Sequence, residues 1–228
     1  MLEELPELRD RERVFRDRRH AGEVLARMLE GRLPAGAKVL AIPAGGVPVA
    51  AAMAEALGLP LDVAVVSKVT PSWDTEVGYG AIAFDGRVRV DPGARARLGV
   101  NDEEARKGIE RTTAKVRQRV ERLRGNAGPL VAPGETAVLV DDGLASGLTM
   151  TTAIEALREA SAARVLVAVP TASGSAASRL ERVSDGIWCP NVRTGWTFAV
   201  AAAYEEWSDV DEPAVVEILE RHPKPPAR

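Results

Sequence analysis

Two adjacent carboxylates, Asp141 and Asp142, are the residues of this sequence best suited to binding a polar ligand. They follow an apolar run at 137–140 and precede a stretch of small and hydroxyl-bearing residues. That stretch consists of Gly143, Leu144, Ala145, Ser146, Gly147, Leu148 and Thr149. Small side chains allow backbone N–H groups to converge on an anion, and the start of a following helix adds positive charge. The stretch 143–149 is therefore a candidate phosphate-binding loop.

The carboxylates suit the vicinal hydroxyls of a sugar, so acids and loop together predict a ribose 5-phosphate site. The alternative is a plain strand–turn–helix junction with solvated acids. The position of the motif favours a ligand, because open α/β sheets bind ligands at the carboxyl ends of their strands.

Two further motifs also follow apolar runs. Residues 42–48 contain Ala44, Gly45 and Gly46, and glycines directly after a strand allow close approach of the backbone to a ligand. A tight strand-to-helix turn is the alternative. Ser67 and Lys68 end the next apolar run. Lys68 is either a phosphate ligand or a solvated strand end.

Two more segments carry side chains of interest. The segment 70–80 has two glycines and contains Asp74 and Glu76, either of which could accept a proton. A surface loop with two exposed acids is the alternative. The segment 188–198 contains Trp188, Trp196 and Phe198, which could stack on a flat ring or could simply close a core or a dimer contact. Cys189, beside them, is best explained as a small buried apolar residue.

The elements that must position these residues alternate between strand and helix. We predict strands over 38–42, 61–66, 136–140, 164–169 and 186–189, and helices over 17–30, 48–57, 101–124, 148–160, 173–183 and 211–221. Asp85-Gly86 predicts a β-hairpin of 81–84 with 87–90. This pattern is typical of a parallel sheet flanked by helices.

Composition excludes several classes of function. The chain has 228 residues, 28% of them charged, and a net charge of −3, so it lacks the basic surface of a nucleic-acid-binding protein. A single cysteine, Cys189, and two histidines, His20 and His222, argue against disulfides, cysteine-rich zinc sites and histidine-based triads. The charged N-terminal segment does not resemble a signal peptide, and no apolar run could span a bilayer. We expect a cytoplasmic protein without a membrane partner.

The string 137–150 resembles the 5-phosphoribosyl-1-pyrophosphate (PRPP) binding signature of type I phosphoribosyltransferases. Gly143 departs from that signature, which usually has a branched or small apolar residue there. The resemblance covers about residues 14–210 and is closest to uncharacterised bacterial and archaeal members that begin Phe-x-Asp-Arg, here Phe15 to Arg18. It implies an α/β fold with a Rossmann-like parallel sheet flanked by helices. It also implies one domain over 1–222, with a lid at 70–80, an inserted hairpin and helix at 81–125, a hood at 186–210, and a disordered tail at 223–228.

The resemblance also implies roles for residues. The loop 143–149 would bind the 5-phosphate of PRPP, and Ala44, Gly45 and Gly46 would form the pyrophosphate loop, which in the family often has a strained or cis peptide. The catalytic residues would be Lys68, Asp141, Asp142 and the lid residue Glu76. The hood aromatics Trp188, Trp196 and Phe198 would hold the acceptor. Mg²⁺ would reach Asp141 and Asp142 mostly through PRPP and water, and the protein would form a homodimer.

The resemblance thus implies transfer of a 5-phosphoribosyl group from PRPP to an acceptor, a nucleobase-like ring, with release of pyrophosphate. Ala44 and Ser67 stand where relatives often carry cations, which implies greater dependence on Mg²⁺ and Lys68. The same two residues favour an alternative, a non-catalytic PRPP- or nucleotide-binding regulatory module. A Mg²⁺-dependent phosphohydrolase using Asp141 is a third hypothesis, but residues 167–174 lack the further acids that it needs.

Overall fold

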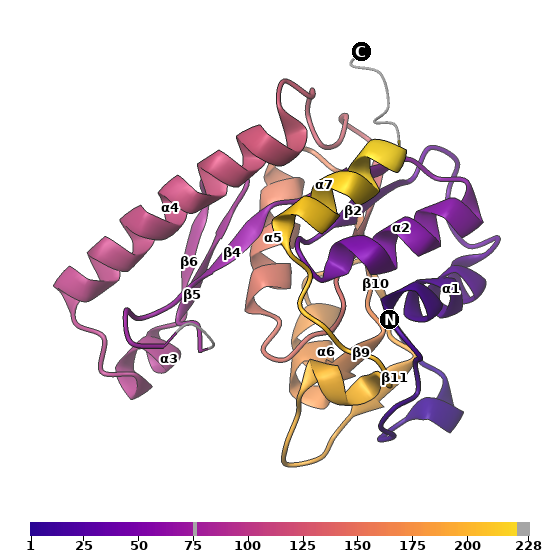
Figure 1. Ribbon diagram of the computed structural model, residues 1–228, viewed down its shortest axis with the longest axis horizontal. Coiled ribbons are helices and arrows are strands. Elements are labelled where there is room, and N and C mark those ends of the chain that lie inside the picture. The colour runs from indigo at the N-terminus through magenta and orange to yellow at the C-terminus, as the bar shows by residue number, and fades with distance from the viewer. Residues whose placement is uncertain (75–76, 223–228) are drawn as a thin grey trace.

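A computed structural model describes residues 1–74 and 77–222 of the chain. Its centre is a parallel sheet of six strands in the order β1-β10-β8-β7-β2-β3 (Figure 1). The strands are β1 (Leu2–Glu3), β2 (Lys38–Ala41), β3 (Leu61–Val63), β7 (Thr136–Val140), β8 (Arg164–Ala168) and β10 (Gly186–Trp188). The predicted α/β class and parallel sheet are confirmed.

Helices cover both faces of this sheet. One face carries α1 (Arg18–Leu29), α2 (Gly46–Leu57) and α7 (Glu212–Arg221), and the other carries α5 (Leu148–Glu159) and α6 (Gly174–Glu181). Alternate residues of a strand face opposite sides. In β7, Val138 and Val140 therefore join the core under α1 and α2, whereas Ala137 and Leu139 join the core under α5.

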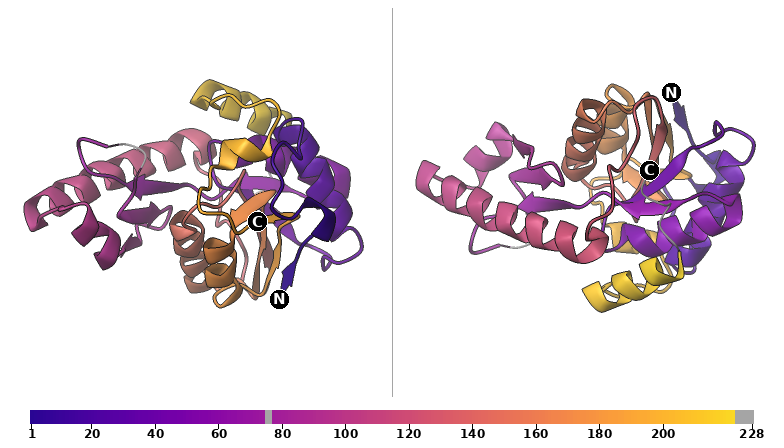
Figure 2. Two further views of the ribbon diagram at one scale, coloured as in Figure 1. Left: turned by 90° about the horizontal axis from the view of Figure 1, so that it is seen from below. Right: turned by 90° about the horizontal axis from the view of Figure 1, so that it is seen from above.

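Residues 66–74 and 77–124 form an arm that extends from one edge of the sheet (Figures 1 and 2). It contains an antiparallel sheet of β4 (Val66–Val69), β5 (Gly80–Ala83) and β6 (Val88–Val90), together with α3 (Pro92–Arg97) and α4 (Asp102–Arg124). Asn101 caps α4 through a reciprocal capping box with Glu104. A buried ion pair fixes the far end of α4 to the main sheet, where Arg124 donates to both oxygens of Asp62 at 3.0 and 2.9 Å.

An N-terminal segment and a segment before α7 lie together beside the carboxyl edge of the sheet. A short parallel pair, β9 (Thr171–Ser173) with β11 (Asn191–Arg193), lies there next to the 3-10 turns η1 (Pro6–Leu8) and η2 (Val200–Ala203). Phe15 pairs with Tyr204 through an isolated bridge, and both are buried in a small separate cluster. The N-terminal segment is thus part of the same structure as the predicted hood.

Several predicted boundaries were wrong. The expected strand 61–66 is two strands, because the chain leaves the parallel sheet after Val63 and β4 pairs antiparallel with β5 instead. A short buried apolar run does not reveal such a change of partner. Helix α2 begins at Gly46, not Pro48, and the short elements β1, β9, β11 and α3 were not predicted.

The predicted tail at 223–228 lies outside the described residues. Within the described part of the chain, no helix is long and apolar enough to cross a membrane.

Candidate active site

The two acids at the end of β7 point in different directions. Asp141 lines a cleft, whereas the Asp142 carboxylate turns toward α1 and forms an ion pair with Arg18. Nε and Nη2 of Arg18 lie 3.0 and 2.9 Å from Oδ2 of Asp142, and the two side chains are only 10% and 16% exposed. The pair therefore occupies one carboxylate oxygen of Asp142 and orients the whole group.

Arg18 is itself held by the C-terminal segment. Its guanidinium lies 3.8 Å from the centre of the Trp207 ring, and Nη1 donates to the Ser208 carbonyl at 2.8 Å. Tyr204 donates its hydroxyl to the Asp142 backbone carbonyl at 2.6 Å. The Phe-x-Asp-Arg motif thus has structural roles: Asp17 caps α1, and Arg18 joins α1 and the C-terminal segment to the acid pair.

Burial sets the electrostatics of the acid pair. It raises the pKa of Asp141 well above the ordinary carboxyl value, and the adjacent charge of Asp142 raises it further. Burial also raises the pKa of Asp142, although Arg18 opposes this shift. Of the two, Asp141 is the acid that lines the cleft, and a cation or a hydroxyl donor there would relieve the cost of its charge.

The glycine motif after β2 lies directly against the acid pair. A Cβ on Gly45 would come within 1.9 Å of Oδ2 of Asp142, and a Cβ on Gly46 would come within 2.7 Å of the Val140 carbonyl. These contacts require glycine at both positions. The peptide bond between Pro43 and Ala44 is cis, as the resemblance implied. Two motifs far apart in sequence therefore form one surface.

The loop after the acids leads into α5 as predicted. Gly147 has a positive φ of 72° and precedes the first turn of α5, which has no side-chain cap. Ala145 and Ser146 are exposed, and Thr149 lines the cleft beside Asp141. The departure at Gly143 has a steric explanation, because a Cβ there would lie 2.5 Å from the Val200 side chain.

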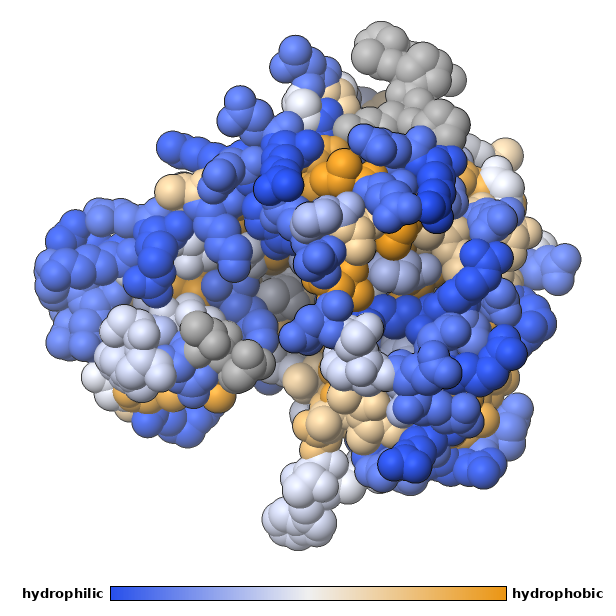
Figure 3. Space-filling model, in the orientation of Figure 1, coloured by the Kyte–Doolittle hydropathy of each residue, from blue (hydrophilic) through white to orange (hydrophobic). Residues whose placement is uncertain are grey.

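The cleft between the arm and the sheet has a volume of about 640 Å³, and the space-filling view shows a hollow there (Figure 3). The predicted residues Lys68, Ser67, Asp141 and Thr149 all line it. Further cleft residues are Ile42, Pro43, Val66, Thr70, Pro71, Ser72, Arg111, Thr112, Lys115 and Arg119. The α4 residues among them were not predicted. Their spacing of three and four, which puts side chains on one face of a helix, was the signal available.

Other predicted site residues lie elsewhere. Trp188 is buried in the core, Trp196 is fully exposed on a loop, and Phe198 packs near the Arg193 guanidinium. None of these three is among the cleft-lining residues that the structure describes. Asp74 accepts a hydrogen bond from the Val77 amide at 3.1 Å, and Glu76 lies outside the described residues.

Metal ligands of the usual protein type do not cluster in the described part of the chain, where no group of three or more His, Cys, Asp or Glu side chains could hold an ion. Asp141 nevertheless offers hard oxygen donors, of the kind that Mg²⁺ prefers, at a half-buried position facing the cleft. This arrangement fits Mg²⁺ that binds chiefly through a phosphorylated ligand.

Comparison with known proteins gives consistent matches. The phosphoribosyl transferase domain model matches residues 35–203. A Mycobacterium tuberculosis protein named as a putative phosphoribosyl transferase is 34% identical over 210 residues, which cover 92% of this chain. They cover only 47% of that protein, so the chain spans about half the length of this relative.

A solved structure is also similar over nearly its whole length. The crystal structure of the protein TT1426 from Thermus thermophilus is 35% identical and superposes with a TM-score of 0.72. The match covers 91% of this chain and 98% of the Thermus protein. The arm, the sheet and the segments around the acid pair therefore belong to a fold that another bacterial protein shares.

Proposed function

Because the chain belongs to the type I phosphoribosyltransferase family, we propose that it transfers the 5-phosphoribosyl group of PRPP to an acceptor and releases pyrophosphate. One observation supports this most: the glycine loop 44–46 lies against Asp141 and Asp142, next to the loop 143–149. The three parts of the proposed PRPP site come from separate segments of the chain but lie next to one another, and Asp141 and Thr149 among them line the cleft.

Each part has a role in the proposed reaction. Backbone amides of 145–149 and the hydroxyls of Ser146 and Thr149 bind the 5-phosphate at the start of α5. Asp141 accepts hydrogen bonds from the ribose hydroxyls. Asp142, oriented by Arg18, contributes its remaining carboxylate oxygen and its negative charge. The anomeric carbon develops positive charge as the bond to pyrophosphate breaks, by analogy with glycoside chemistry, and the nearby carboxylates favour that charge.

The negative charge of the departing pyrophosphate must be stabilised by cations. Lys68 and Pro43 both line the cleft, and Lys68 supplies one cation there. Asp141 and Asp142 would hold Mg²⁺ mainly through PRPP and water, and the metal, when bound, would offset the charge of the departing pyrophosphate. The backbone of residues 44–46 supplies the rest of the contacts.

The acceptor in this proposal is a nucleobase-like ring. Its binding by the segment 186–210, through Trp196 and Phe198, requires these side chains to move toward the cleft, because Trp196 is fully exposed in this structure. Glu76 or Asp74 would accept the proton that the acceptor loses. Both roles rest on the family resemblance.

Pyrophosphate release is the direct test. The protein is incubated with PRPP, Mg²⁺ and a panel of bases and other nucleophiles, and pyrophosphate is measured for wild type and for Asp141→Asn. We expect one class of acceptor to stimulate release by wild type and no stimulation with the variant. If no acceptor stimulates release although PRPP binds, the transferase proposal is wrong and the regulatory module is supported instead. Ala44 and Ser67, without cations, are the residues that favour that second function.

A further inference from the structure

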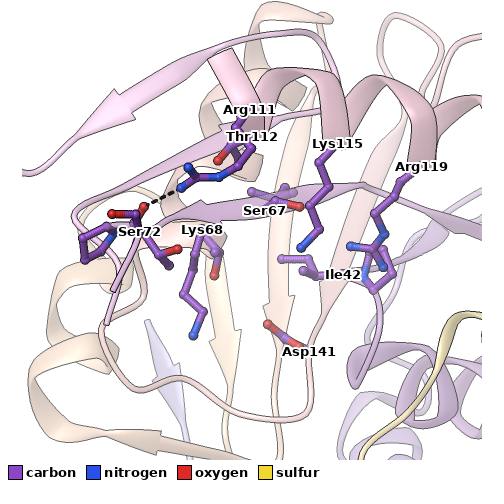
Figure 4. A pocket seen from close by; sticks show the side chains of 14 residues that line it. Ile42, Ser67, Lys68, Ser72, Arg111, Thr112, Lys115, Arg119 and Asp141 are labelled. Atoms are coloured by element: carbon purple, nitrogen blue, oxygen red, sulfur yellow. Dashed lines mark hydrogen bonds between the residues drawn. The ribbon is translucent and has the colours of Figure 1, made fainter. Parts of the chain in front are cut away.

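The cleft has a positively charged wall that the PRPP site described above does not use. Arg111, Lys115 and Arg119 lie one turn apart on α4 and line the cleft opposite Asp141. Figure 4 shows Lys115 and Arg119 pointing from α4 toward Ile42 and Asp141. With Lys68, four cations line the described cleft against the single carboxylate of Asp141. We propose that this wall binds the pyrophosphate group of PRPP and of the product, an inference that rests on the proposed function.

The position of the wall matches the pyrophosphate end of the site. Arg119 lies near Ile42 (Figure 4), and Pro43, which leads into the loop 44–46, lines the same cleft. Arg111 lies near Lys68 and donates to the Thr70 carbonyl at the start of the 70–80 segment. The wall therefore lies beside the loop that lacks a cation at Ala44. The α4 cations would provide the side-chain charge that relatives often place in the loop itself.

The spacing suits an extended anion. Side chains four residues apart on a helix lie about 6 Å from one another, so the row presents charge along a line and not at a point. A diphosphate carries charge on both phosphoryl groups and can contact two members of the row. The 5-phosphate of PRPP would bind at 145–149 and would not contact this row of cations.

The existing contacts leave Lys115 and part of the Arg111 guanidinium available to a ligand. Lys115 forms no ion pair with any residue in the described ranges, and it is exposed. Nη2 of Arg111 donates to the Thr70 carbonyl at 3.0 Å, which leaves the other N–H groups of the guanidinium for a ligand. Arg119 forms an ion pair with Glu212 at 3.2 Å, and Glu212 also pairs with Arg122. The one negative charge of Glu212 is therefore shared between two arginines and does not fully neutralise Arg119.

Ser67 gives an independent indication that a ligand binds here. The residue lines the same cleft and is only 5% exposed, yet its Oγ is buried with no hydrogen-bond partner among the described atoms. An unpaired buried hydroxyl costs free energy. A phosphoryl oxygen or its bound water in the cleft would supply the missing partner.

Two ligands test the two halves of the site separately. Binding of inorganic pyrophosphate and of ribose 5-phosphate, each with Mg²⁺, is measured by calorimetry for wild type and four variants: Lys115→Ala, Lys115→Glu, Arg111→Ala and Thr149→Val. The control is Arg117→Ala, an exposed cation of α4 that does not line the cleft. Lys115 is exposed, so its replacement by the better helix former alanine leaves the fold intact.

We expect Lys115→Ala and Arg111→Ala each to weaken pyrophosphate binding about tenfold, as for loss of a charge-assisted contact, and ribose 5-phosphate binding less than about twofold. Thr149→Val should weaken ribose 5-phosphate binding more than pyrophosphate binding. Lys115→Glu should weaken pyrophosphate binding more than Lys115→Ala does. The control Arg117→Ala should change neither affinity. Wild-type pyrophosphate affinity in Lys115→Glu and Arg111→Ala overturns the inference. Binding of ribose 5-phosphate without binding of pyrophosphate also overturns it but leaves the sugar-phosphate site intact. Failure of wild type to bind either ligand overturns the proposed function as well.

Discussion

Arg18→Gln tests the ion pair that orients Asp142. The change removes both contacts to Oδ2, the stacking on Trp207 and the hydrogen bond to Ser208, and it leaves a carboxylate mostly buried beside Asp141. Breaking one partner of a buried pair typically costs about 3–5 kcal/mol. Because the two side chains are 10% and 16% exposed, water relieves part of this cost, and we expect about 3 kcal/mol, the lower end of the range.

Thermal and urea unfolding give the measurement. For a chain of this size a loss of about 3 kcal/mol lowers the Tm by roughly 6–12 °C. Arg19→Gln is the matched control. Arg19 is the next residue of the same helix, but its side chain is 65% exposed, and its pairs with Glu23 and Glu55 are long at 3.4 and 3.3 Å. Such a surface pair contributes less than about 1 kcal/mol.

A double-mutant cycle separates the ion pair from the other contacts of Arg18. Asp142→Asn removes the charge while keeping the shape, so Arg18→Gln combined with Asp142→Asn should destabilise by clearly less than the sum of the single changes. We expect a coupling of about 1.5 kcal/mol or more, within the range seen for contacting residues. Additive effects, or an Arg18→Gln protein as stable as wild type, would refute the reasoning that Arg18 orients Asp142.

Two further substitutions and one labelling experiment test the burial of individual side chains. Burial raises the pKa of Asp141 above its ordinary value of 3.8, so the native state binds the carboxyl proton more tightly than the unfolded state does. The free energy of unfolding therefore falls as the pH rises from the unfolded-state pKa to the higher pKa of the native state. Asp141→Asn should therefore be more stable than wild type near pH 7, with the gain vanishing below about pH 4; urea titrations at both pH values measure it, and an equal or lower stability at pH 7 contradicts it. Gly45→Ala places a Cβ 1.9 Å from Oδ2 of Asp142 and should cost about 1–3 kcal/mol as overpacking, whereas the control Gly128→Ala, with no atom within 4 Å of its Cβ, should change little. Burial raises the pKa of the Cys189 thiol, so a disulfide reagent should label this single cysteine only after unfolding, and rapid labelling of the native protein would show that the segment opens easily.

Much of the fold and part of the site could be predicted from local sequence. The acids, the loop 143–149 and the glycines at 45 and 46 are short strings that follow apolar runs, and the structure places each of them after a strand, as predicted. Asp17 and Asn101 are the first residues of two predicted helices, and both cap them, because a cap acts on backbone N–H groups two or three residues away. Runs of apolar residues likewise located the main strands of the parallel sheet.

Contacts between distant segments were decided only by the tertiary structure. The sequence does not show that the chain leaves the sheet after Val63, and that change of partner carries α4 over the cleft with its three cations. It does not show that Arg18 reaches Asp142 across 124 residues of chain, or that Trp188 faces the core and Trp196 the solvent. A local pattern determines the conformation of a segment and which of its faces is apolar. Which side chains meet depends on strand order and on how the layers pack, and these follow from the burial of the chain as a whole.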